Sequence, residues 1–272
     1  DIVTGIQPMQ PGFGASTSTG SMFGVELSMG VCLGNAMQTP VLLFKSDHGG
    51  TTLGNDWRPP SAVAARGGVV GLEYTNTVNN LKALLNSFDA DLADDGKLNA
   101  YNNATGYEVC GLVWIQGWNE MYNDGGYTAT QLQAEYAANL VDFVHDIRNC
   151  DPRVASDLAA IIPESTDQNA TLNAARISAV AALNAQTPGS ALYFNTDNMI
   201  GTNWGNNEDG QPFSTSWGYH YNARAENYLE IGWRIGTAIV DNGWTGTDPA
   251  PEPGTLGLLA VAGLAILRRR RQ

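Results

Sequence analysis

Short, wholly apolar runs alternate with longer stretches that carry apolar residues at helical spacing. The short runs lie at residues 41–44, 109–115 and 191–194, with a further run within residues 155–162, and such runs suit strands that are buried on both faces. The helical stretches lie at residues 24–38, 75–88, 128–149, 170–184 and 223–240. Strands that alternate with helices in this way predict an α/β fold with a mainly parallel sheet.

The C-terminal residues have a different pattern. Pro251-Glu252-Pro253 precedes an apolar run from Leu256 to Leu267, and the four arginines Arg268–Arg271 follow it. The run of 12 residues is too short to cross a hydrocarbon core, which needs about 20. A short apolar run closed by a cationic block is typical of a processing and sorting signal. A C-terminal helix is the alternative, but a packed core explains neither the prolines nor the arginines.

The order of these parts resembles the PEP-CTERM signal of Gram-negative bacteria. The resemblance implies export, recognition of the tail by an exosortase, and removal of the tail. We therefore expect only transient membrane contact through residues 251–272, and a mature protein in the periplasm, on the outer cell surface or in the extracellular matrix. We exclude this tail from the fold and expect one domain over residues 1–244, followed by a linker over 245–250.

The charge balance excludes some classes of partner. The sequence has 14 basic and 27 acidic residues, and the tail from residue 252 contains four of the basic and one of the acidic ones. The remainder is strongly acidic and repels the phosphates of nucleic acids, so we expect no DNA or RNA partner. Charged residues make up only 15% of the chain, and Gly, Asn, Thr and Ser are abundant, which suits a loop-rich secreted protein.

The cysteines and histidines give no clear site. Cys32, Cys110 and Cys150 allow one disulfide with one thiol left over in an oxidising compartment, and the sequence does not say which two would pair. No cysteine pair has the spacing of metal ligands, and the three histidines are too scattered for a metal site that the sequence alone reveals. We therefore expect neither a metal nor another cofactor.

Two polar segments directly follow predicted strands, where open parallel sheets form their sites. Gly49 and Gly50 follow the first strand, and paired glycines let backbone N–H groups approach a ligand closely, although a plain turn explains them equally well. Gln116-Gly117-Trp118-Asn119-Glu120 follows the second strand. An uncharged amide at this place can stabilise an oxyanion, and an Asx-type turn is the alternative.

A third segment, Tyr219-His220-Tyr221-Asn222, precedes the last predicted helix. A histidine in this setting can act as a general base, although a packed, hydrogen-bonded histidine explains the pattern as well.

Together and in this order, the segments resemble the SGNH-hydrolase superfamily, in the branch of carbohydrate acetylesterases related to sialate O-acetylesterase. The Gln-Gly-x-Asn and His-Tyr-Asn elements are fairly specific, whereas the paired glycines are not. The matching stretches span most of residues 20–240 and comprise residues 23–27, 41–51, 56–60, 113–119, 218–222 and 228–232. The resemblance implies a three-layer α/β/α sandwich, flavodoxin-like, that hydrolyses acyl esters on sugars by a Ser–His mechanism.

The resemblance also implies roles for individual residues. His220 would be the base, and the oxyanion donors would be the N–H of Gly50 or Gly49 and the side chain of Asn119, in the element that begins with Gln116. The substrate would be an acylated carbohydrate or polysaccharide. Many relatives place an acid three residues before the histidine, where this chain has Trp217. The orienting carboxylate is therefore left open among Glu120, Asp197 and Asp209.

The chain departs from the family pattern at the nucleophile. The Gly-Gln-Ser-Asn turn that carries the catalytic serine occurs nowhere in the sequence. The chain begins with Asp1-Ile2-Val3 rather than with a methionine or a signal peptide. We therefore expect an N-terminally incomplete domain that lacks its first strand and the nucleophile, and that is inactive as it stands. Trp118 also replaces an acidic residue of the family.

Two other functions are compatible with the sequence. A non-catalytic carbohydrate-binding or extracellular-matrix protein on the same fold would use the seven tryptophans and ten tyrosines to stack on sugars. A glycosidase with paired carboxylates would have Glu26 and Glu120 as nominal candidates, but neither lies in a convincing acid–base motif.

Overall fold

The predicted alternation of strands and helices is present in the computed structural model. The structure describes residues 9–11, 23–37, 41–93, 109–165, 169–196, 225–244, 257–261 and 264–267. Each helix and strand predicted before residue 245 is confirmed, with its ends shifted by a few residues. In chain order the elements are α1 (Glu26–Met37), β1 (Val41–Lys45), α2 (Pro60–Arg66), α3 (Leu72–Ala93), β2 (Val109–Val113), the 3-10 helix η1 (Trp118–Met121), α4 (Ala129–Arg148), β3 (Val154–Pro163), α5 (Ala170–Gln186), β4 (Ala191–Phe194), α6 (Ala225–Asp241), β5 (Gly257–Val261) and β6 (Leu264–Leu267).

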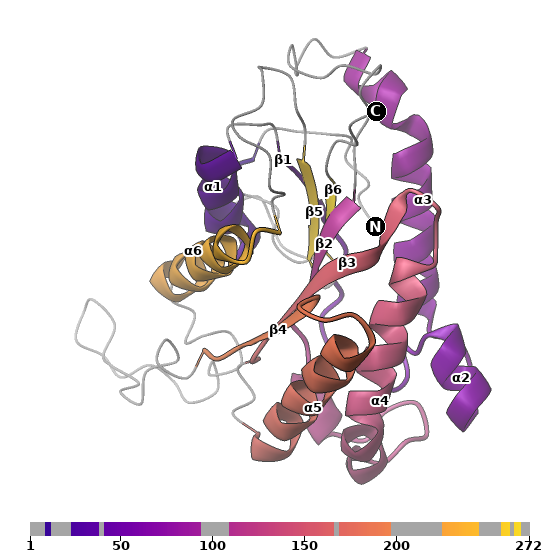
Figure 1. The fold of residues 1–272 in the computed structure, drawn as a ribbon. Helices are drawn as coiled ribbons and strands as arrows, with labels where there is room; N and C mark the ends of the chain where they lie inside the picture. Colours follow the sequence, from indigo (N-terminus) through magenta and orange to yellow (C-terminus); the bar gives the residue numbers. More distant parts are fainter. Residues whose placement is uncertain are drawn as a thin grey trace.

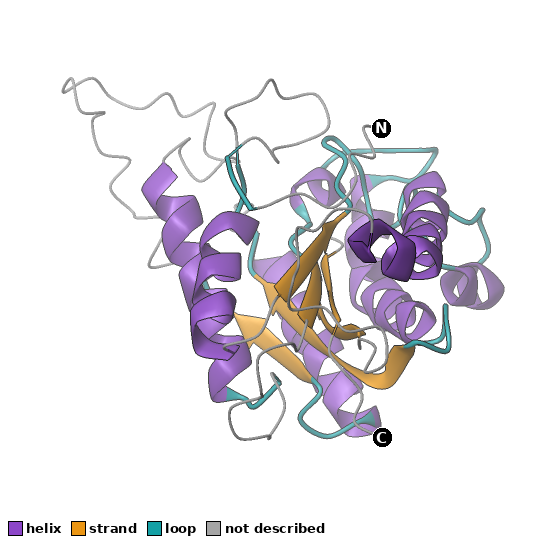
Figure 2. Cartoon of the chain, turned by 90° about the horizontal axis from the view of Figure 1, so that it is seen from above, coloured by secondary structure: helices purple, strands orange, loops and turns teal. Residues whose placement is uncertain are grey.

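The sheet lies between two layers of helices. Helices α1 and α6 cover one face, and α3, α4 and α5 cover the other (Figures 1 and 2). Successive right-handed crossovers in one direction along a sheet place their helices on the same face, which explains why α4 and α5 pack side by side. The α/β class is confirmed, and the layout is compatible with a flavodoxin-like arrangement.

The strand order is β1-β5-β6-β2-β3-β4. Strands β2, β3 and β4 are parallel, with Leu112 opposite Ala160 and Ala160 opposite Ala191. Strand β5 runs parallel to β1, and β6 runs antiparallel to β5. The C-terminal run was expected to lie outside the fold, whereas the strand order places β5 and β6 between β1 and β2. A run of Leu, Ala and Val suits a strand buried on both faces as well as a membrane, so its composition does not decide between them.

The core is centred on β2 and β3. Four of the five residues of β2 are buried, as are the last six residues of β3. Trp114, directly after β2, is fully buried, and its ring centroid lies 4.3 Å from that of Phe143 and 5.4 Å from that of Trp57. All five residues of β1, by contrast, are only half-buried.

Helix α4 begins at a capping box. The Thr128 hydroxyl accepts a hydrogen bond from the Gln131 N–H, and the Gln131 side chain accepts one from the Thr128 N–H at 2.9 Å. These bonds satisfy backbone donors that an uncapped helix start leaves unpaired. The buried face of α4 is the one that helical spacing predicts, namely Leu132, Tyr136, Leu140, Phe143, Val144 and Ile147.

Helices α1 and α6 approach closely because α6 carries glycines at the contact. A Cβ on Gly232 would lie 2.0 Å from the carbonyl oxygen of Val25, and one on Gly236 would lie 2.8 Å from Cβ of Cys32. Cys32 is buried here as a free thiol, and Cys150 is a half-buried free thiol whose pKa burial raises to about 11. Neither belongs to a disulfide, so the pairing that the sequence allowed is not formed by these two residues.

Helix α2 was not predicted from the sequence. Its first residue is Pro60, and Pro59 precedes it in an extended conformation. Proline is favoured at the first helical position, where its missing N–H would have no intrahelical acceptor, so the two prolines start a helix rather than exclude one.

Candidate functional site

The loops after β1 and β2 meet at the carboxyl edge of the sheet. The backbone oxygen of Thr51 accepts hydrogen bonds from Gln116 Nε2 at 3.1 Å and from Asn119 Nδ2 at 3.3 Å. A Cβ on Gly50 would lie 3.9 Å from Asn119 Nδ2. The structure therefore brings together Gly50, Gln116 and Asn119, which the sequence analysis selected from two separate segments. Gly49 lies next to Gly50 in the same exposed turn.

Two glycines determine the backbone path of these loops. Gly50 has φ +81° and Gly117 has φ +149°, conformations that other residues rarely adopt. Gly117 turns the chain directly after Gln116, so that η1 begins at once and returns Asn119 toward Thr51. A Cβ on Gly49 would meet no atom within 4 Å, and one on Gly50 would make only ordinary van der Waals contact, so Gly50 is required by its φ angle and not by a close approach.

Glu120 is fully buried between the two loops. Its Oε1 accepts a hydrogen bond from the Leu53 N–H at 2.5 Å, and its Oε2 accepts one from Gln116 Nε2 at 2.6 Å. Burial raises the pKa of this carboxyl to about 7, and the two hydrogen bonds act in the opposite direction. Glu120 thus fastens the loop after β1 to the loop after β2, which makes it a positioning residue for Gln116.

Trp57 anchors the loop after β1 to the core. Its Nε1 donates to Thr51 Oγ1 at 2.8 Å, and its ring packs edge-on against Trp114. The Thr51 hydroxyl in turn donates to the backbone oxygen of His48 at 2.7 Å. The turn that holds Gly49 and Gly50 therefore rests on buried aromatic rings.

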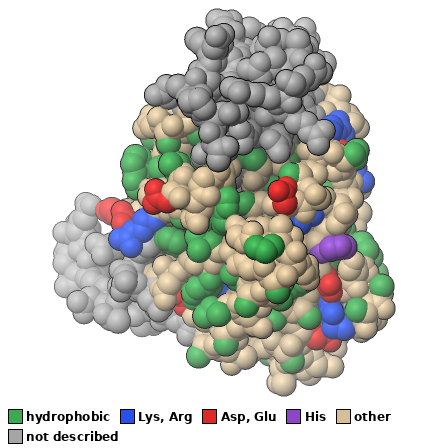
Figure 3. Space-filling model, viewed as in Figure 1, with side chains coloured by type: hydrophobic (Ala, Val, Ile, Leu, Met, Phe, Trp, Pro, Cys, Tyr) green, Lys and Arg blue, Asp and Glu red, His purple; other side chains and the backbone are tan. Residues whose placement is uncertain are grey.

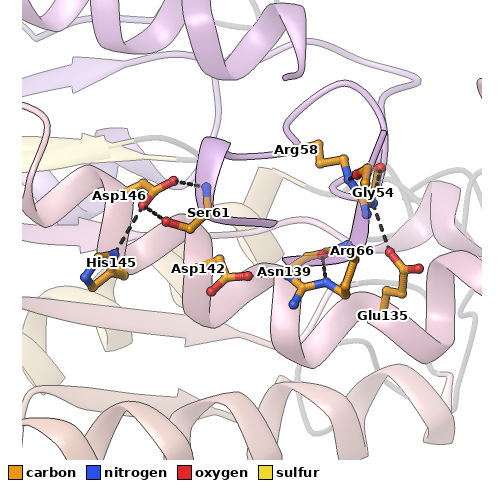
Figure 4. A network of polar contacts seen from close by, with 10 residues as sticks. Gly54, Arg58, Ser61, Arg66, Glu135, Asn139, Asp142, His145 and Asp146 are labelled. Atoms are coloured by element: carbon orange, nitrogen blue, oxygen red, sulfur yellow. Dashed lines mark hydrogen bonds and ion pairs between the residues drawn. The ribbon is translucent and has the colours of Figure 1, made fainter. Parts of the chain in front are cut away.

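A polar network joins the segment after the glycine turn to α4 (Figure 4). Arg58 is 1% exposed, and its Nη1 donates to the backbone oxygen of Gly54 and to Glu135 Oε2, both at 2.9 Å. Ser61 donates from its N–H and its hydroxyl to the carboxylate of Asp146 at 2.8 and 2.5 Å. Residues 56–60, one of the stretches that carry the family resemblance, therefore help to keep the loop after β1 in place.

A second polar cluster lies beside Gln116 and was missed by the sequence analysis. The backbone oxygen of Gln116 accepts from Tyr136 Oη at 2.8 Å and from Arg176 Nη2 at 2.9 Å, and the Arg176 guanidinium lies over the Tyr136 ring. Glu164, fully buried directly after β3, bonds to Asn173 and to the Thr196 N–H after β4. A polar residue directly after the buried run of β3 was the signal that would have revealed Glu164.

Two polar groups near the glycine turn are available for chemistry. His48 Nδ1 lies 2.8 Å from Glu73 Oε1, and the His48 side chain is 50% exposed. The side-chain oxygen of Gln116 is buried and has no hydrogen-bond partner among the described residues. A buried acceptor without a donor is costly, so a ligand hydroxyl that reached this oxygen would be bound favourably.

Several predicted site residues lie outside the described residues, namely His220, Asp197 and Asp209. Their roles stay predictions. Of the three candidate orienting acids, Glu120 alone is described, and both of its oxygens already accept hydrogen bonds. Glu26, the other nominal carboxylate of a glycosidase, is buried and forms an ion pair with Lys45 Nζ at 3.2 Å.

Other features of the surface lie apart from this cluster. A hollow of about 450 Å³ between α1 and α6 is lined by apolar side chains that include Val31, Leu229 and Trp233, and by none of the predicted site residues. Apolar side chains are visible on this side of the molecule in Figure 3. Within the described ranges, no group of three His, Cys, Asp or Glu side chains is placed to hold a metal ion. None of the helices in those ranges has the length and apolar character needed to cross a membrane.

Comparison with known proteins identifies the tail. Residues 249–271 match the family model of the PEP-CTERM protein-sorting motif, which confirms the sorting signal predicted from the sequence. The motif indicates an exported protein that is sorted to the cell surface and whose tail is recognised by an exosortase. Comparisons with curated proteins and with solved structures give no match.

Proposed function

We propose that this protein is an exported carbohydrate esterase of the SGNH type, which removes acyl groups, chiefly acetyl, from sugars or polysaccharide. The observation that carries the proposal is the meeting of Gly50, Gln116 and Asn119 at the carboxyl edge of the sheet. These residues come from loops 65 or more positions apart in the sequence, and a common hydrogen-bond acceptor, the Thr51 oxygen, holds both amides. The sorting motif supports export to the cell surface, where the enzyme would encounter acylated polysaccharide.

The chemistry follows the residue types. A serine hydroxyl attacks the ester carbonyl while His220 takes its proton, and the resulting oxyanion is held by the Gly50 N–H and Asn119 Nδ2. His220 returns the proton to the leaving sugar hydroxyl, and water then releases the acid from the acyl-enzyme by the same route. Asn119 Nδ2 carries two hydrogens, so it can donate to an oxyanion while it still bonds to Thr51. The proposal assigns no nucleophile, because the Gly-Gln-Ser-Asn turn is absent from the sequence.

The decisive test uses the protein as produced from its native gene, with aryl acetate and acetylated polysaccharide as substrates. Asn119→Ala should lower kcat by about 10²–10³, because one oxyanion donor is lost. The control Asn79→Ala, on the exposed face of α3, should leave kcat unchanged. Turnover that is insensitive to Asn119→Ala, or that resists a serine-directed inhibitor, would refute the esterase proposal.

A second candidate is a non-catalytic protein that binds acylated carbohydrate on the same fold. It is favoured by Trp118 in place of the acidic residue of the family. This candidate predicts that Asn119→Ala weakens binding of the acetylated sugar while neither variant releases acetate. Acetate release by the native protein would exclude it.

A further inference from the structure

Helix α6 carries a second stripe of residues beside the face that α1 covers. Its buried face packs against α1, with Gly232 and Gly236 at the contact. The second stripe, at helical spacing, lines the hollow of about 450 Å³ between the two helices. We call this hollow the α1–α6 groove, and its lining includes Leu27 and Val31 of α1 and Glu226, Leu229, Glu230 and Trp233 of α6.

The apolar side chains of the α1–α6 groove are exposed to solvent. Val31 is 49% exposed, Leu229 38% and Trp233 47%. Figure 3 shows apolar and charged side chains together on this side of the molecule. Single exposed apolar residues are ordinary, but neighbouring ones around a hollow mark an interaction site, and tryptophan is among the residue types that most often anchor a protein partner. The groove therefore has the character of a small docking surface.

The charges of the groove favour a cation. Glu226 and Glu230 lie one turn apart on the same stripe of α6, and like charges at this spacing repel each other. Glu230 forms an ion pair with Arg234 at 2.6 Å, but both side chains are about half exposed, so this pair holds the carboxylate only weakly. Among the described residues no cation forms an ion pair with Glu226, and neither Lys nor Arg lines the groove. A basic group between the two carboxylates would relieve their repulsion.

These features select the occupant. A second copy docked through the same groove would bring the Glu226 and Glu230 carboxylates of both copies together, and an acidic chain also repels anionic lipid. A third helix fits between two packed helices, with its apolar side chains in the groove and its polar ones at the rim. We propose that the α1–α6 groove binds a partner protein through a cationic amphipathic helix, whose apolar side chains contact Trp233 and whose Lys or Arg side chains pair with Glu226 and Glu230. None of the predicted esterase residues lines the groove, so this binding does not depend on the proposed function.

Binding of a model helix tests the groove. The probe is a fluorescein-labelled amphipathic peptide of Leu and Lys, titrated with the full chain and followed by fluorescence anisotropy. We expect saturable binding with a Kd on the order of 10–100 μM, as suits a small interface, and Trp233→Ala should weaken it about tenfold. The control Tyr122→Ala removes an aromatic side chain that is 56% exposed outside the groove, and should leave the Kd unchanged. No saturation, or equal effects of the two substitutions, would overturn the proposal.

Two charge-matched variants separate the groove from a general attraction to an acidic protein. E226Q/E230Q and D157N/D241N each remove two negative charges, and Asp157 and Asp241 are exposed outside the groove. The first variant should weaken peptide binding about three- to tenfold, because two partly exposed ion pairs are lost. The second should weaken it less than about twofold, because distant surface charges are screened by salt. Equal losses would mean that the peptide is attracted by net charge alone, and would refute a specific site.

Photo-cross-linking of the unsubstituted chain gives an answer that does not depend on how the variants fold. A peptide of the same composition that carries a benzophenone group should cross-link to residues 27–31 and 226–233, mapped by mass spectrometry after proteolysis. Cross-links confined to other segments would overturn the proposal. Sedimentation velocity supplies the remaining outcome: self-association of the chain that Trp233→Ala abolishes would show a second copy in the groove and would exclude the cationic partner.

Discussion

Strands β2, β3 and β4 pair with one another, and the crossover helices α4 and α5 connect them in the sequence. Among the described strands, β1 instead pairs with β5 and β6, which come from the far end of the chain. Strands β2 and β3 are also better buried, because most of their residues are inaccessible, while every residue of β1 is half-exposed. Contacts between distant segments cost more loop-closure entropy than local crossovers do. The comparison teaches that one side of the sheet is stabilised by local crossovers, whereas β1 depends on partners from a distant part of the sequence.

The largest expected effect contrasts two aromatic side chains, one on each side of the sheet. Trp114→Ala should lower the free energy of unfolding by about 3–5 kcal/mol, because it empties a fully buried site that packs against Trp57 and Phe143. Phe44→Ala on half-buried β1 should cost less than half as much. Urea unfolding followed by far-UV circular dichroism measures both losses. Equal losses would show that the two sides are packed alike.

The sequence predicted the first side of the sheet well, because strong periodicity in stretches such as 128–149 reflects a single buried face. It also predicted that Gly50 and Asn119 would meet, since both follow parallel strands whose carboxyl ends share one edge. It did not predict the place of β5, because an apolar run is equally suited to a sheet and to a membrane and tertiary partners decide. It did not predict the burial of Glu120, since that depends on the Leu53 N–H, which is distant in sequence.

The second prediction concerns Glu120, which ties the loop of β1 to the loop of β2. Its folded pKa of about 7 exceeds the ordinary value of 4.5, so between these values the folded state keeps a proton that the unfolded state has lost. The contribution of Glu120 to the free energy of unfolding is therefore fully present below the lower of these two pKa values. It falls by roughly 3 kcal/mol as the pH rises toward 7. Glu120→Gln cannot titrate and should remove this part of the pH dependence.

Urea unfolding at pH 4.5, 5.5 and 7 checks the Glu120 prediction against the exposed control Glu230→Gln. The control should keep the pH dependence of the unsubstituted chain, because Glu230 lies on the surface of α6. A Glu120→Gln variant with an unchanged pH slope would mean that the carboxyl already titrates normally in the folded protein, and that the tie between the loops does not depend on a buried charge.

The smallest expected effects compare a helix from each side. Thr128→Ala removes the hydroxyl that caps α4 and should lower the free energy of unfolding by about 1 kcal/mol, because a backbone N–H at the helix start loses its acceptor. Arg234→Ala removes an ion pair with Glu230 on the surface of α6, and should cost only about 0.3–0.5 kcal/mol, since both side chains are about half exposed and screened by water. Added salt should reduce the second loss and leave the first, because a neutral cap is not screened. Thermal unfolding at low and high salt separates the two. If the destabilisation caused by Thr128→Ala vanished in high salt, α4 would be stabilised by charge rather than by the capping box. The capping box would then no longer be a local interaction that distinguishes this side of the sheet from the other.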